Sequence, residues 1–506
     1  MTSKHSPSRY GVWPELVPRL ERAGWLSHRQ VTEPALPLLR AVRSGPDPEG
    51  ALDCIASALE ADPEMAARSL SDLEYGLALV AIAGSSRIFG NRIATGSGTL
   101  PAPGSAPPTP AAPSPSPAET LSNIRSFVHD SMMRIAVRDL MRYDDLVTVG
   151  RSLADLADLA AQISLTSAEL EIRANPRFVD LPEIPIAIIA MGKWGGLELN
   201  YSSDIDLLFV HGTSEEVDAP TTAEYTRRVC SSFISNLSQV TAEGSAYRVD
   251  VDLRPEGRSG PLARTVDSYR NYYERWASTW EFQALIKARS AAGDADLGAQ
   301  FLAMAEPFVY PETLDPAAVR EVREIKGRIE GRAAEQGLDE VEIKRGIGGI
   351  RDIEFAVQLL QLVHGRFDEH LRSANTLNTL RRLGEEGYVG RSDAEDMATA
   401  YVWLRTLEHR IQLVDLRQTH LLPDDRGERE RLSKSMGYRD RADTPAIDSF
   451  ERDLIAHRSV VRTIHERLFY RPLLEAFAAS PTVSLTVEGA ARQLIALGFR
   501  DVRGAR

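Results

Sequence analysis

The sequence is poor in cysteine and has no long apolar run. Cys54 and Cys230 are its two cysteines, which are too few for a disulfide framework or a cysteine-rich zinc site and suit a reducing cytoplasm. No stretch approaches the roughly 18 apolar residues of a membrane span, and the first residues lack the apolar segment of a signal peptide. We therefore expect a cytoplasmic protein that does not bind a membrane.

Positive charge is also scarce, since the 506 residues carry a formal net charge of -13. This balance argues against a dedicated nucleic-acid surface and leaves room only for a local basic groove. The sequence also lacks a Walker-type GxxxxGK[ST] loop, a Cys/His metal spacing and a Ser-His-Asp order. Its 43% hydrophobic and 26% charged residues are ordinary for a globular protein.

Three short segments have the pattern of strands. They are the apolar runs 184–191 and 206–210 and the alternating stretch 246–253. Apolar residues at three- and four-residue steps predict helices over 119–175, and nearly everything from about residue 267 onward has a helical pattern. The sequence therefore predicts an α+β, predominantly helical fold, in which a small mixed sheet lies between helical regions.

The expected organisation has six parts. They are an N-terminal helical region at 1–100, a Pro/Ala/Ser-rich insertion at 101–118, helices leading into the core at 119–175, the core itself at 176–295, a helical segment with a basic glycine-rich loop at 296–365, and a C-terminal helical bundle at 366–506. We expect the insertion to be flexible and exposed, because its composition cannot bury a core.

The most informative stretch is GKWGGLELNYSSDIDLLFV, which begins at Gly192. Asp204 and Asp206 stand at i and i+2 of an apolar strand, so their side chains should share one face. An isolated Asp-x-Asp most often marks a solvated strand end. Here the continuous apolar run predicts burial, and two buried carboxylates without partners would be costly. That conflict favours a bound cation.

The stretch 246–253 brings Asp250 and Asp252, again at i and i+2. Pairing of this strand with the first Asp-x-Asp would make an oxygen-rich site for Mg²⁺, a metal that substrate phosphates usually complete. Two such ions assist in-line phosphoryl displacement. The residues that could offer backbone N–H or hydroxyl groups to phosphate are Gly195, Gly196, Ser202 and Ser203.

Basic residues follow the acidic motifs. Arg254, Lys287 and Arg289 are candidate phosphate ligands, because arginine binds phosphate bidentately and lysine binds it as a point charge. Each taken singly is more often solvated or part of a salt bridge. As a set behind the carboxylates, the two interpretations are about equally supported.

The run KRGIGGIRDIE, which begins at Lys344, is a basic glycine-rich loop that enters a helix. Because helix N-termini attract anions, Lys344, Arg345, Arg351 and Glu354 are candidates for contact with nucleotide or phosphate. The alternative is an ordinary solvated helix face. Further along, His409, Arg410 and His420 are expected to be surface or capping groups.

Five motifs in this order resemble the bifunctional glutamine synthetase adenylyltransferase/adenylyl-removing enzyme family, which is part of the nucleotidyltransferase superfamily. They are GKWGGLELNYSSDIDLLFV, YRVDVDLRPEGRSGPL, WASTWEFQALIKAR, IKRGIGGIRDIEFAVQLLQLVHG and LRTLEHRIQLVDLRQTHLLP. The resemblance implies a nucleotidyltransferase core at 176–295. It also implies that Asp204 and Asp206 are the catalytic metal-binding pair. Asp250 is preferred as the third ligand, with Asp252 as the alternative.

The form ELNYSSDID is similar to the first, adenylyl-removing half of that family, and the chain holds no second copy of it. The resemblance therefore implies an N-terminal half that stops before a second catalytic half. The implied reaction is Mg²⁺-dependent phosphorolysis with two ions: phosphate attacks adenylylated glutamine synthetase and ADP leaves. A PII-type signal protein is the implied regulatory partner. The alternatives are adenylyl transfer from ATP to glutamine synthetase and a non-catalytic regulatory binding module.

Overall fold

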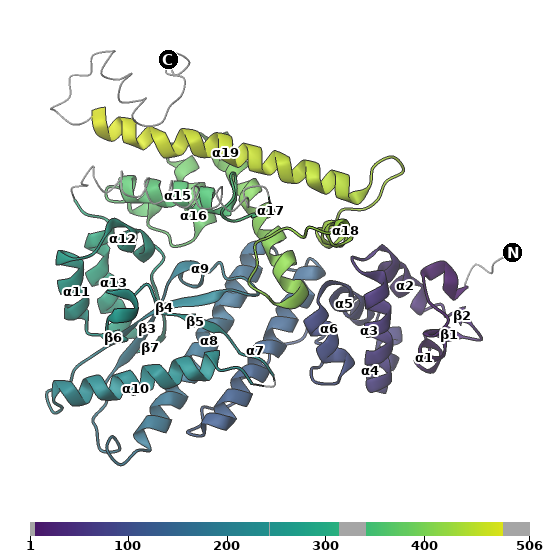
Figure 1. The fold of residues 1–506 in the computed structure, drawn as a ribbon, viewed down its shortest axis with the longest axis horizontal. Coiled ribbons are helices and arrows are strands. Elements are labelled where there is room, and N and C mark those ends of the chain that lie inside the picture. The colour runs from purple at the N-terminus through teal and green to yellow at the C-terminus, as the bar shows by residue number, and fades with distance from the viewer. Residues whose placement is uncertain (1–5, 242, 313–340, 479–506) are drawn as a thin grey trace.

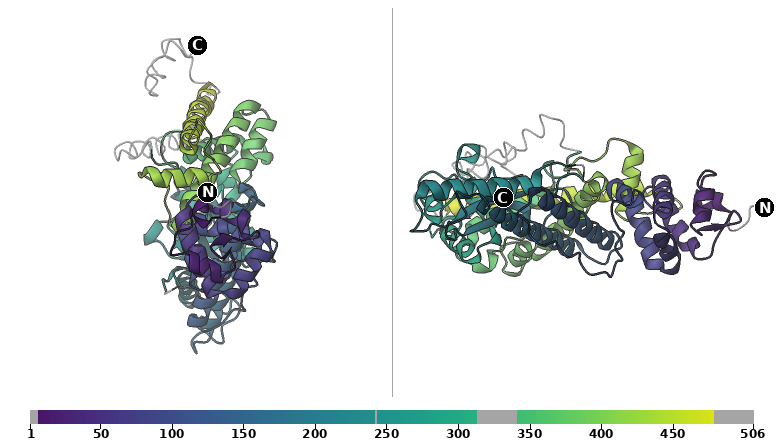
Figure 2. Two further views of the ribbon diagram at one scale, coloured as in Figure 1. Left: turned by 90° about the vertical axis from the view of Figure 1, so that its right-hand side faces the viewer. Right: turned by 90° about the horizontal axis from the view of Figure 1, so that it is seen from below.

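The computed structural model describes residues 6–241, 243–312 and 341–478, and it is predominantly helical with a small central sheet. Figures 1 and 2 show the N-terminal helices at one end of an elongated molecule and the C-terminal helices stacked along one side of the sheet. This architecture confirms the predicted α+β class. Within the described ranges, no helix is long and apolar enough to cross a membrane.

The N-terminal region is a bundle of short helices. They are η1 (Pro7–Tyr10), α1 (Val17–Arg22), α2 (Ala35–Ser44), α3 (Pro48–Ala61), α4 (Pro63–Ser71), α5 (Leu73–Ser85) and α6 (Arg87–Ala94). The side chains of Asp47, Asp62, Asp72 and Ser86 accept backbone N–H bonds at the starts of α3 to α6, and these caps explain where the helices begin. A small hairpin of β1 (Leu26–Ser27) and β2 (Gln30–Val31) was not predicted.

The long helices α7 (Pro117–Leu140) and α8 (Leu146–Arg173) confirm the helical pattern of 119–175. They pack against each other and against α10 (Ala219–Ser238). One continuous apolar core joins these helices both to the N-terminal bundle and to the sheet. The N-terminal helices therefore do not have a core of their own.

The proline-rich segment lies before α7 and forms neither helix nor strand over 101–116. It is held to α7 by arginines that donate to its carbonyl groups, Arg134 to Ser105 at 2.8 Å and Arg138 to Pro103 at 3.1 Å. The absence of regular structure agrees with its composition. Its flexibility stays a prediction.

The sheet contains β3 (Ile186–Ala190), β4 (Asp204–His211), β5 (Arg248–Asp250), β6 (Ala263–Arg264) and β7 (Arg289–Gly293). Its strand order is β5-β4-β3-β7, with β6 also paired to β4. The pairs of β3 with β4 and with β7 are antiparallel, and those of β4 with β5 and β6 are parallel. The long helix α10 lies between β4 and β5 in the chain and allows their parallel pairing.

Alternate residues of β3 enter two different cores, as the period of a strand requires. Ile186, Ile188 and Ala190 join the core with α7, α8 and α10. Ala187 and Ile189 join a second core with α11 (Val266–Arg275) and α13 (Ala295–Val309). Helices therefore cover both faces of the sheet, which explains why 184–191 is an uninterrupted apolar run.

Two strand predictions need correction. The third strand covers only Arg248–Asp250, not 246–253. The segment Arg289–Gly293, predicted to be helical, is strand β7. Its sequence RSAAG has no strand signal of its own, and its conformation comes from pairing with β3.

The C-terminal helices form a third core. They are α15 (Ile350–His364), α16 (Thr376–Glu385), α17 (Arg391–Asp415), α18 (Arg426–Ser435) and α19 (Ala446–Ala478); α12 (Thr279–Leu285) precedes them. The turn residues Gly192–Gly195 form a single helical turn, α9. Helix α17 also contacts α5, α6 and α8, so it joins this core to the N-terminal part of the molecule.

The prediction that His409, Arg410 and His420 are surface or capping groups was wrong. His409 is 1% exposed and Arg410 is 7% exposed, and the His420 side chain is mostly buried. Arg410 forms two 2.6 Å bonds to Asp139 on α7, and His409 lies 3.2 Å from Asn200. Polar side chains of α17 thus face buried partners that sequence periodicity does not reveal.

His409 gives a prediction for the pH dependence of stability. Burial, and then the positive charge of Arg405, lowers the pKa of His409 to about 3. Because the unfolded chain binds a proton near pH 6.5 and the folded chain does not, this group's contribution to stability is complete above that pH and is lost as pH falls. We expect His409→Gln to weaken this loss by about 1 kcal/mol between pH 7 and pH 5.5.

Urea unfolding at the two pH values measures this difference. His370→Gln is the matched control, since His370 is exposed on η3 (Glu369–Leu371). Equal pH dependence of wild type and His409→Gln would show that His409 does not carry the effect.

Candidate functional site

The two predicted Asp-x-Asp motifs lie on neighbouring strands. Asp204 and Asp206 begin β4, and Asp250 ends β5. In the parallel register of these strands, Asp206 is the partner of Asp250. The structure therefore places Asp250 directly beside the first motif, as the resemblance implied.

The three carboxylates have different surroundings. Asp204 accepts from Arg248 at 2.6 Å and from Gln418 at 2.9 Å, one on each oxygen. Asp250 accepts from the backbone N–H of Asp252 at 2.7 Å. The carboxylate of Asp206 lies against Gly192, where an added Cβ would stand 2.4 Å from its Oδ2. Gly192 also has a φ of 53°, so both space and backbone conformation call for glycine.

Asp206 has the most perturbed environment of the three. Burial, followed by repulsion from Asp250 and Asp204, raises the pKa of Asp206 to about 7. The positive charges of Lys344 and Lys193 act in the opposite direction. A buried carboxylate that is repelled by its neighbours is the setting that a divalent cation would stabilise.

Two observations therefore favour a metal ion here: the negative charge around Asp206 and the strand pairing that places Asp250 next to it. Asp206 and Asp250 supply adjacent oxygen ligands of the kind that Mg²⁺ prefers. In the described part of the chain, however, no group of three or more His, Cys, Asp or Glu side chains is gathered closely enough to hold an ion. Both oxygens of Asp204 are engaged with Arg248 and Gln418. The adjacent pair fits a cation, and the three-carboxylate set is not assembled.

The alternative ligand, Asp252, lies beyond the end of β5. It is 2.9 Å from Arg258, an exposed residue. Arg254 is buried and donates to the backbone carbonyl of Val251 at 2.8 Å. These contacts occupy Asp252 and Arg254 within their own turn, which favours Asp250 over Asp252 as a ligand.

The loop between β3 and β4 is closely packed. An added Cβ at Gly195 would lie 1.8 Å from the carbonyl oxygen of Lys287, and one at Gly196 would lie 2.7 Å from Glu198. Ser202 donates its N–H to Gln412 at 3.1 Å and its hydroxyl to the carbonyl of Leu416 at 3.0 Å. These glycines and Ser202 therefore have structural roles, whereas Ser203, next to Asp204, is half-buried.

Two predicted phosphate ligands lie in ion pairs away from the carboxylates. Lys287 is buried and donates to Glu198 at 2.5 Å. Arg289 forms two 2.8 Å bonds to Asp158 on α8. Lys287 and Arg405 more than offset the effect of burial on Glu198 and hold the pKa of Glu198 below its ordinary value. The structure does not bring Lys287 or Arg289 to Asp206.

The basic glycine-rich loop does approach the carboxylates. Lys344 is close enough for its charge to act on Asp206, Lys193 and Glu408. Glu354, one turn into α15, acts on Lys193 in the same way. Arg345 is exposed beside Glu342, and Arg351 lies over the ring of Phe355. Lys344 is thus the predicted basic residue that the structure places best.

Several residues at the site were missed by sequence reasoning. Lys193 is mostly buried and pairs with Glu408 at 2.9 Å, and burial lowers the pKa of Lys193 to about 7. Glu408 is fully buried on α17. The segment RTLEHRIQ carries charged or polar residues on every face of its helix. That feature is unusual for an internal helix and could have indicated polar partners.

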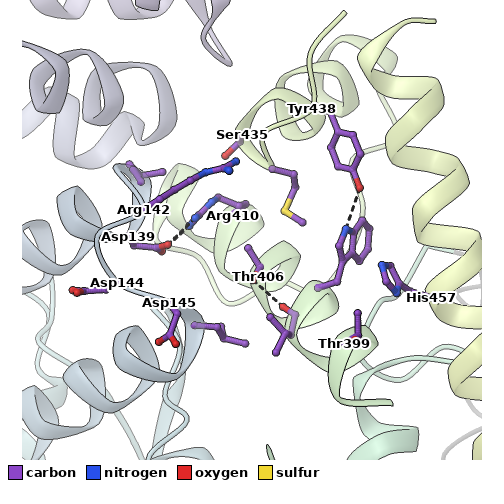
Figure 3. A pocket seen from close by; sticks show the side chains of 16 residues that line it. Asp139, Arg142, Asp144, Asp145, Thr399, Thr406, Arg410, Ser435, Tyr438 and His457 are labelled. Atoms are coloured by element: carbon purple, nitrogen blue, oxygen red, sulfur yellow. Dashed lines mark hydrogen bonds and ion pairs between the residues drawn. The ribbon is translucent and has the colours of Figure 1, made fainter. Parts of the chain in front are cut away.

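Two cavities open away from the carboxylates. The first, of about 630 Å³, lies between the turn that joins α7 to α8, the helix α17 and the connection from α18 to α19. Figure 3 shows Arg410 reaching across it to Asp139. The second, of about 600 Å³, separates the N-terminal helices from α17 and α18. Neither is lined by Asp204, Asp206 or Asp250.

Two family models match parts of the chain. A family model described as glutamate-ammonia ligase adenylyltransferase matches residues 110–304, and one described as GlnD PII-uridylyltransferase matches residues 320–469. The chain is 43% identical to a protein of Streptomyces avermitilis over 76% of the chain and 38% of that protein. It is 36% identical to a protein of Mycobacterium avium over 98% of the chain and 50% of that protein.

Both relatives are named bifunctional glutamine synthetase adenylyltransferase/adenylyl-removing enzyme. The chain spans about half the length, or less, of the curated relatives it matches. The first family model covers the whole sheet with its two Asp-x-Asp motifs, and the second covers α15 to α18 and most of α19. From these matches and from the strand arrangement that they cover, the chain belongs to the glutamine synthetase adenylyltransferase/adenylyl-removing enzyme family.

Proposed function

We propose that this chain is a Mg²⁺-dependent nucleotidyltransferase that regulates glutamine synthetase by removing AMP from its adenylylated tyrosine. Phosphate enters and ADP leaves. The observation that carries the proposal is the parallel register of β4 and β5. It pairs Asp206, which stands two residues after Asp204, with Asp250. The names of the relatives support the substrate. The removing direction rests on the ELNYSSDID form of residues 198–206.

In this reaction an oxygen of inorganic phosphate attacks the phosphorus of the tyrosine-linked AMP. The new P–O bond makes ADP, and the bond to the tyrosine oxygen breaks. The leaving tyrosinate takes its proton from water, and a phenol pKa of about 10 makes it a tolerable leaving group. When bound, Mg²⁺ would supply charge neutralisation at the phosphoryl oxygens. Asp206 and Asp250 would hold it, with Asp204 joining if Arg248 and Gln418 release it.

The carboxylates would hold Mg²⁺, and the basic glycine-rich loop would bind phosphate. Lys344 acts on Asp206 through its charge but belongs to a different segment of the chain. It can therefore bind a phosphate group that the carboxylates do not bind. Its cation offsets the negative charge that phosphate and three carboxylates bring together. The residues of the chain thus orient two anions and keep them from repelling each other.

A PII-type signal protein is proposed as the regulatory partner and the cytoplasm as the location. The match of residues 320–469 to a family model described as PII-uridylyltransferase supports the choice of partner. The low cysteine content supports the location.

The second candidate is transfer of AMP from ATP to glutamine synthetase. The description of the first family model as an adenylyltransferase favours it. Purified protein separates the two candidates. Adenylylated synthetase with phosphate and Mg²⁺ should give ADP, whereas unmodified synthetase with ATP would give pyrophosphate. Failure to bind Mg²⁺ or nucleotide would leave a non-catalytic binding module.

The paired carboxylates give a prediction for the rate of ADP release. Asp206→Asn and Asp250→Asn should each reduce ADP release by about a hundredfold or more, because each removes charge that orients the reacting groups. Asp252→Asn is the matched control. Its exposed ion pair contributes at most about 1 kcal/mol, so the rate should change by less than about fivefold. The opposite ranking of Asp250 and Asp252 would overturn the ligand assignment.

The same carboxylates give a prediction for binding of the metal alone. Excess Mg²⁺ should raise Tm of the wild-type protein by about 2 °C or more, because an ion that binds only the folded state stabilises it by mass action. Asp206→Asn and Asp250→Asn should lose this rise and Asp252→Asn should keep it, as measured by calorimetry with and without chelator. A rise that persists in all three variants would place the ion elsewhere.

A further inference from the structure

The loop that leads into the first Asp-x-Asp is held by a helix about two hundred residues away in sequence. From α17, Tyr401 donates to Glu198 at 2.6 Å, and Arg405 donates to the carbonyl of Glu198 at 2.6 Å. Farther along the helix, Gln412 accepts from Ser202, and beyond its end Gln418 donates to Asp204. These contacts tie the loop before β4, and Asp204 itself, to α17 and to the residues that follow it.

Within this set, Lys193 and Glu408 differ from an ordinary buried ion pair. Lys193 follows Gly192, the glycine against which Asp206 packs. Its Nζ lies 2.9 Å from Glu408, and its side chain is 11% exposed. An ammonium group has three donor hydrogens, and Glu408 accepts one of them. The Glu408 pair therefore leaves donor capacity on Lys193, the residue next to the glycine that packs against Asp206.

The charges around Lys193 indicate that an anion would use its remaining donor hydrogens. Lys193 and Lys344 are close enough to repel each other, and both attract the carboxylate of Asp206. Glu408, the anion that pairs with Lys193, is shared with His420 at 2.8 Å and with Arg405 at 3.3 Å. Phosphoryl oxygens would satisfy both ammonium groups.

The second ion pair of α17 shows what a purely structural anchor looks like. Arg410 and Asp139, which Figure 3 shows side by side, form two 2.6 Å bonds. Tyr201 donates to the same carboxylate at 2.8 Å. Both oxygens of Asp139 are engaged in this pair, which faces a cavity away from Asp206 and fixes α17 to α7. It offers a matched control for the Lys193–Glu408 pair on the same helix.

We propose that Lys193 contacts phosphoryl oxygens in the nucleotidyl-transfer site and that Glu408 is the positioning residue that holds it there. The inference rests on the proposed function for its reaction, but the binding of phosphate or ADP does not require turnover. It assigns to α17 a direct part in the site, in addition to its part in the fold.

The experiment compares three near-isosteric variants of the full chain, Lys193→Gln, Glu408→Gln and Asp139→Asn. Isothermal calorimetry measures binding of inorganic phosphate and, separately, of ADP, with Mg²⁺ present. Lys193→Gln should weaken binding of one or both by about tenfold, the loss expected for a hydrogen bond to a charged group. The anion that loses affinity identifies which phosphoryl group Lys193 touches.

Glu408→Gln should weaken the same anion by a smaller factor, because the amide oxygen still accepts from Lys193 but no longer carries charge. In the activity assay, both variants should raise KM for phosphate or lower kcat in proportion to the binding loss. Lys193→Arg should recover part of the affinity, since it restores the charge. Asp139→Asn should lower Tm while the affinity for both anions stays at the wild-type value.

Two results would overturn the proposal: wild-type affinity for both anions in Lys193→Gln, or an equal loss of affinity in Asp139→Asn and Glu408→Gln. If Lys193→Gln does not fold, Lys193→Met serves in its place. Wild-type protein that binds ADP through Lys193 but releases none from adenylylated synthetase would refute the proposed function and leave this inference standing. Turnover with unchanged anion affinity in Lys193→Gln would do the reverse.

Discussion

The structure depends on the pairing of charges that folding has removed from water. Glu198 and Glu408 are buried, and each is stabilised by cations from distant parts of the chain, Lys287 and Arg405 for the first and Lys193 and Arg405 for the second. A buried carboxylate that lost these partners would cost several kcal/mol. The loop before β4 can therefore adopt its conformation only when α17 is docked, and the position of Asp204 and Asp206 follows from that contact.

This dependence explains which parts of the molecule could be predicted from sequence. The apolar runs of β3 and β4 and the helical spacing of α7 and α8 depend on local pattern, and they were predicted correctly. Strand β7 has no such pattern, because its conformation is imposed by pairing with β3. Strand β5 is short because the chain turns at Asp252. There Arg258 donates to the Asp252 carboxylate and Arg254 donates to the carbonyl of Val251.

Some residues of the candidate site could likewise be proposed from sequence, and others could not. The carboxylates could be located because aspartates inside an apolar strand conflict with burial, and such a conflict is visible in sequence. The basic candidates could not be sorted, because Lys287 and Lys344 look alike until the fold shows that Glu198 engages only the first. Lys193 and Glu408 are 215 positions apart, and no spacing rule connects them.

The bidentate pair between Arg87 of α6 and Asp415 at the end of α17 joins the N-terminal bundle to the C-terminal helices. Asp415 stands three residues before Gln418, which touches Asp204. Together with the shared apolar core, this pair connects the N-terminal helices to the site through space as well as through the chain. These noncovalent contacts should hold the two parts together even if the chain is cut within the irregular segment 101–116. The gene could be divided there and the two polypeptides should still find each other.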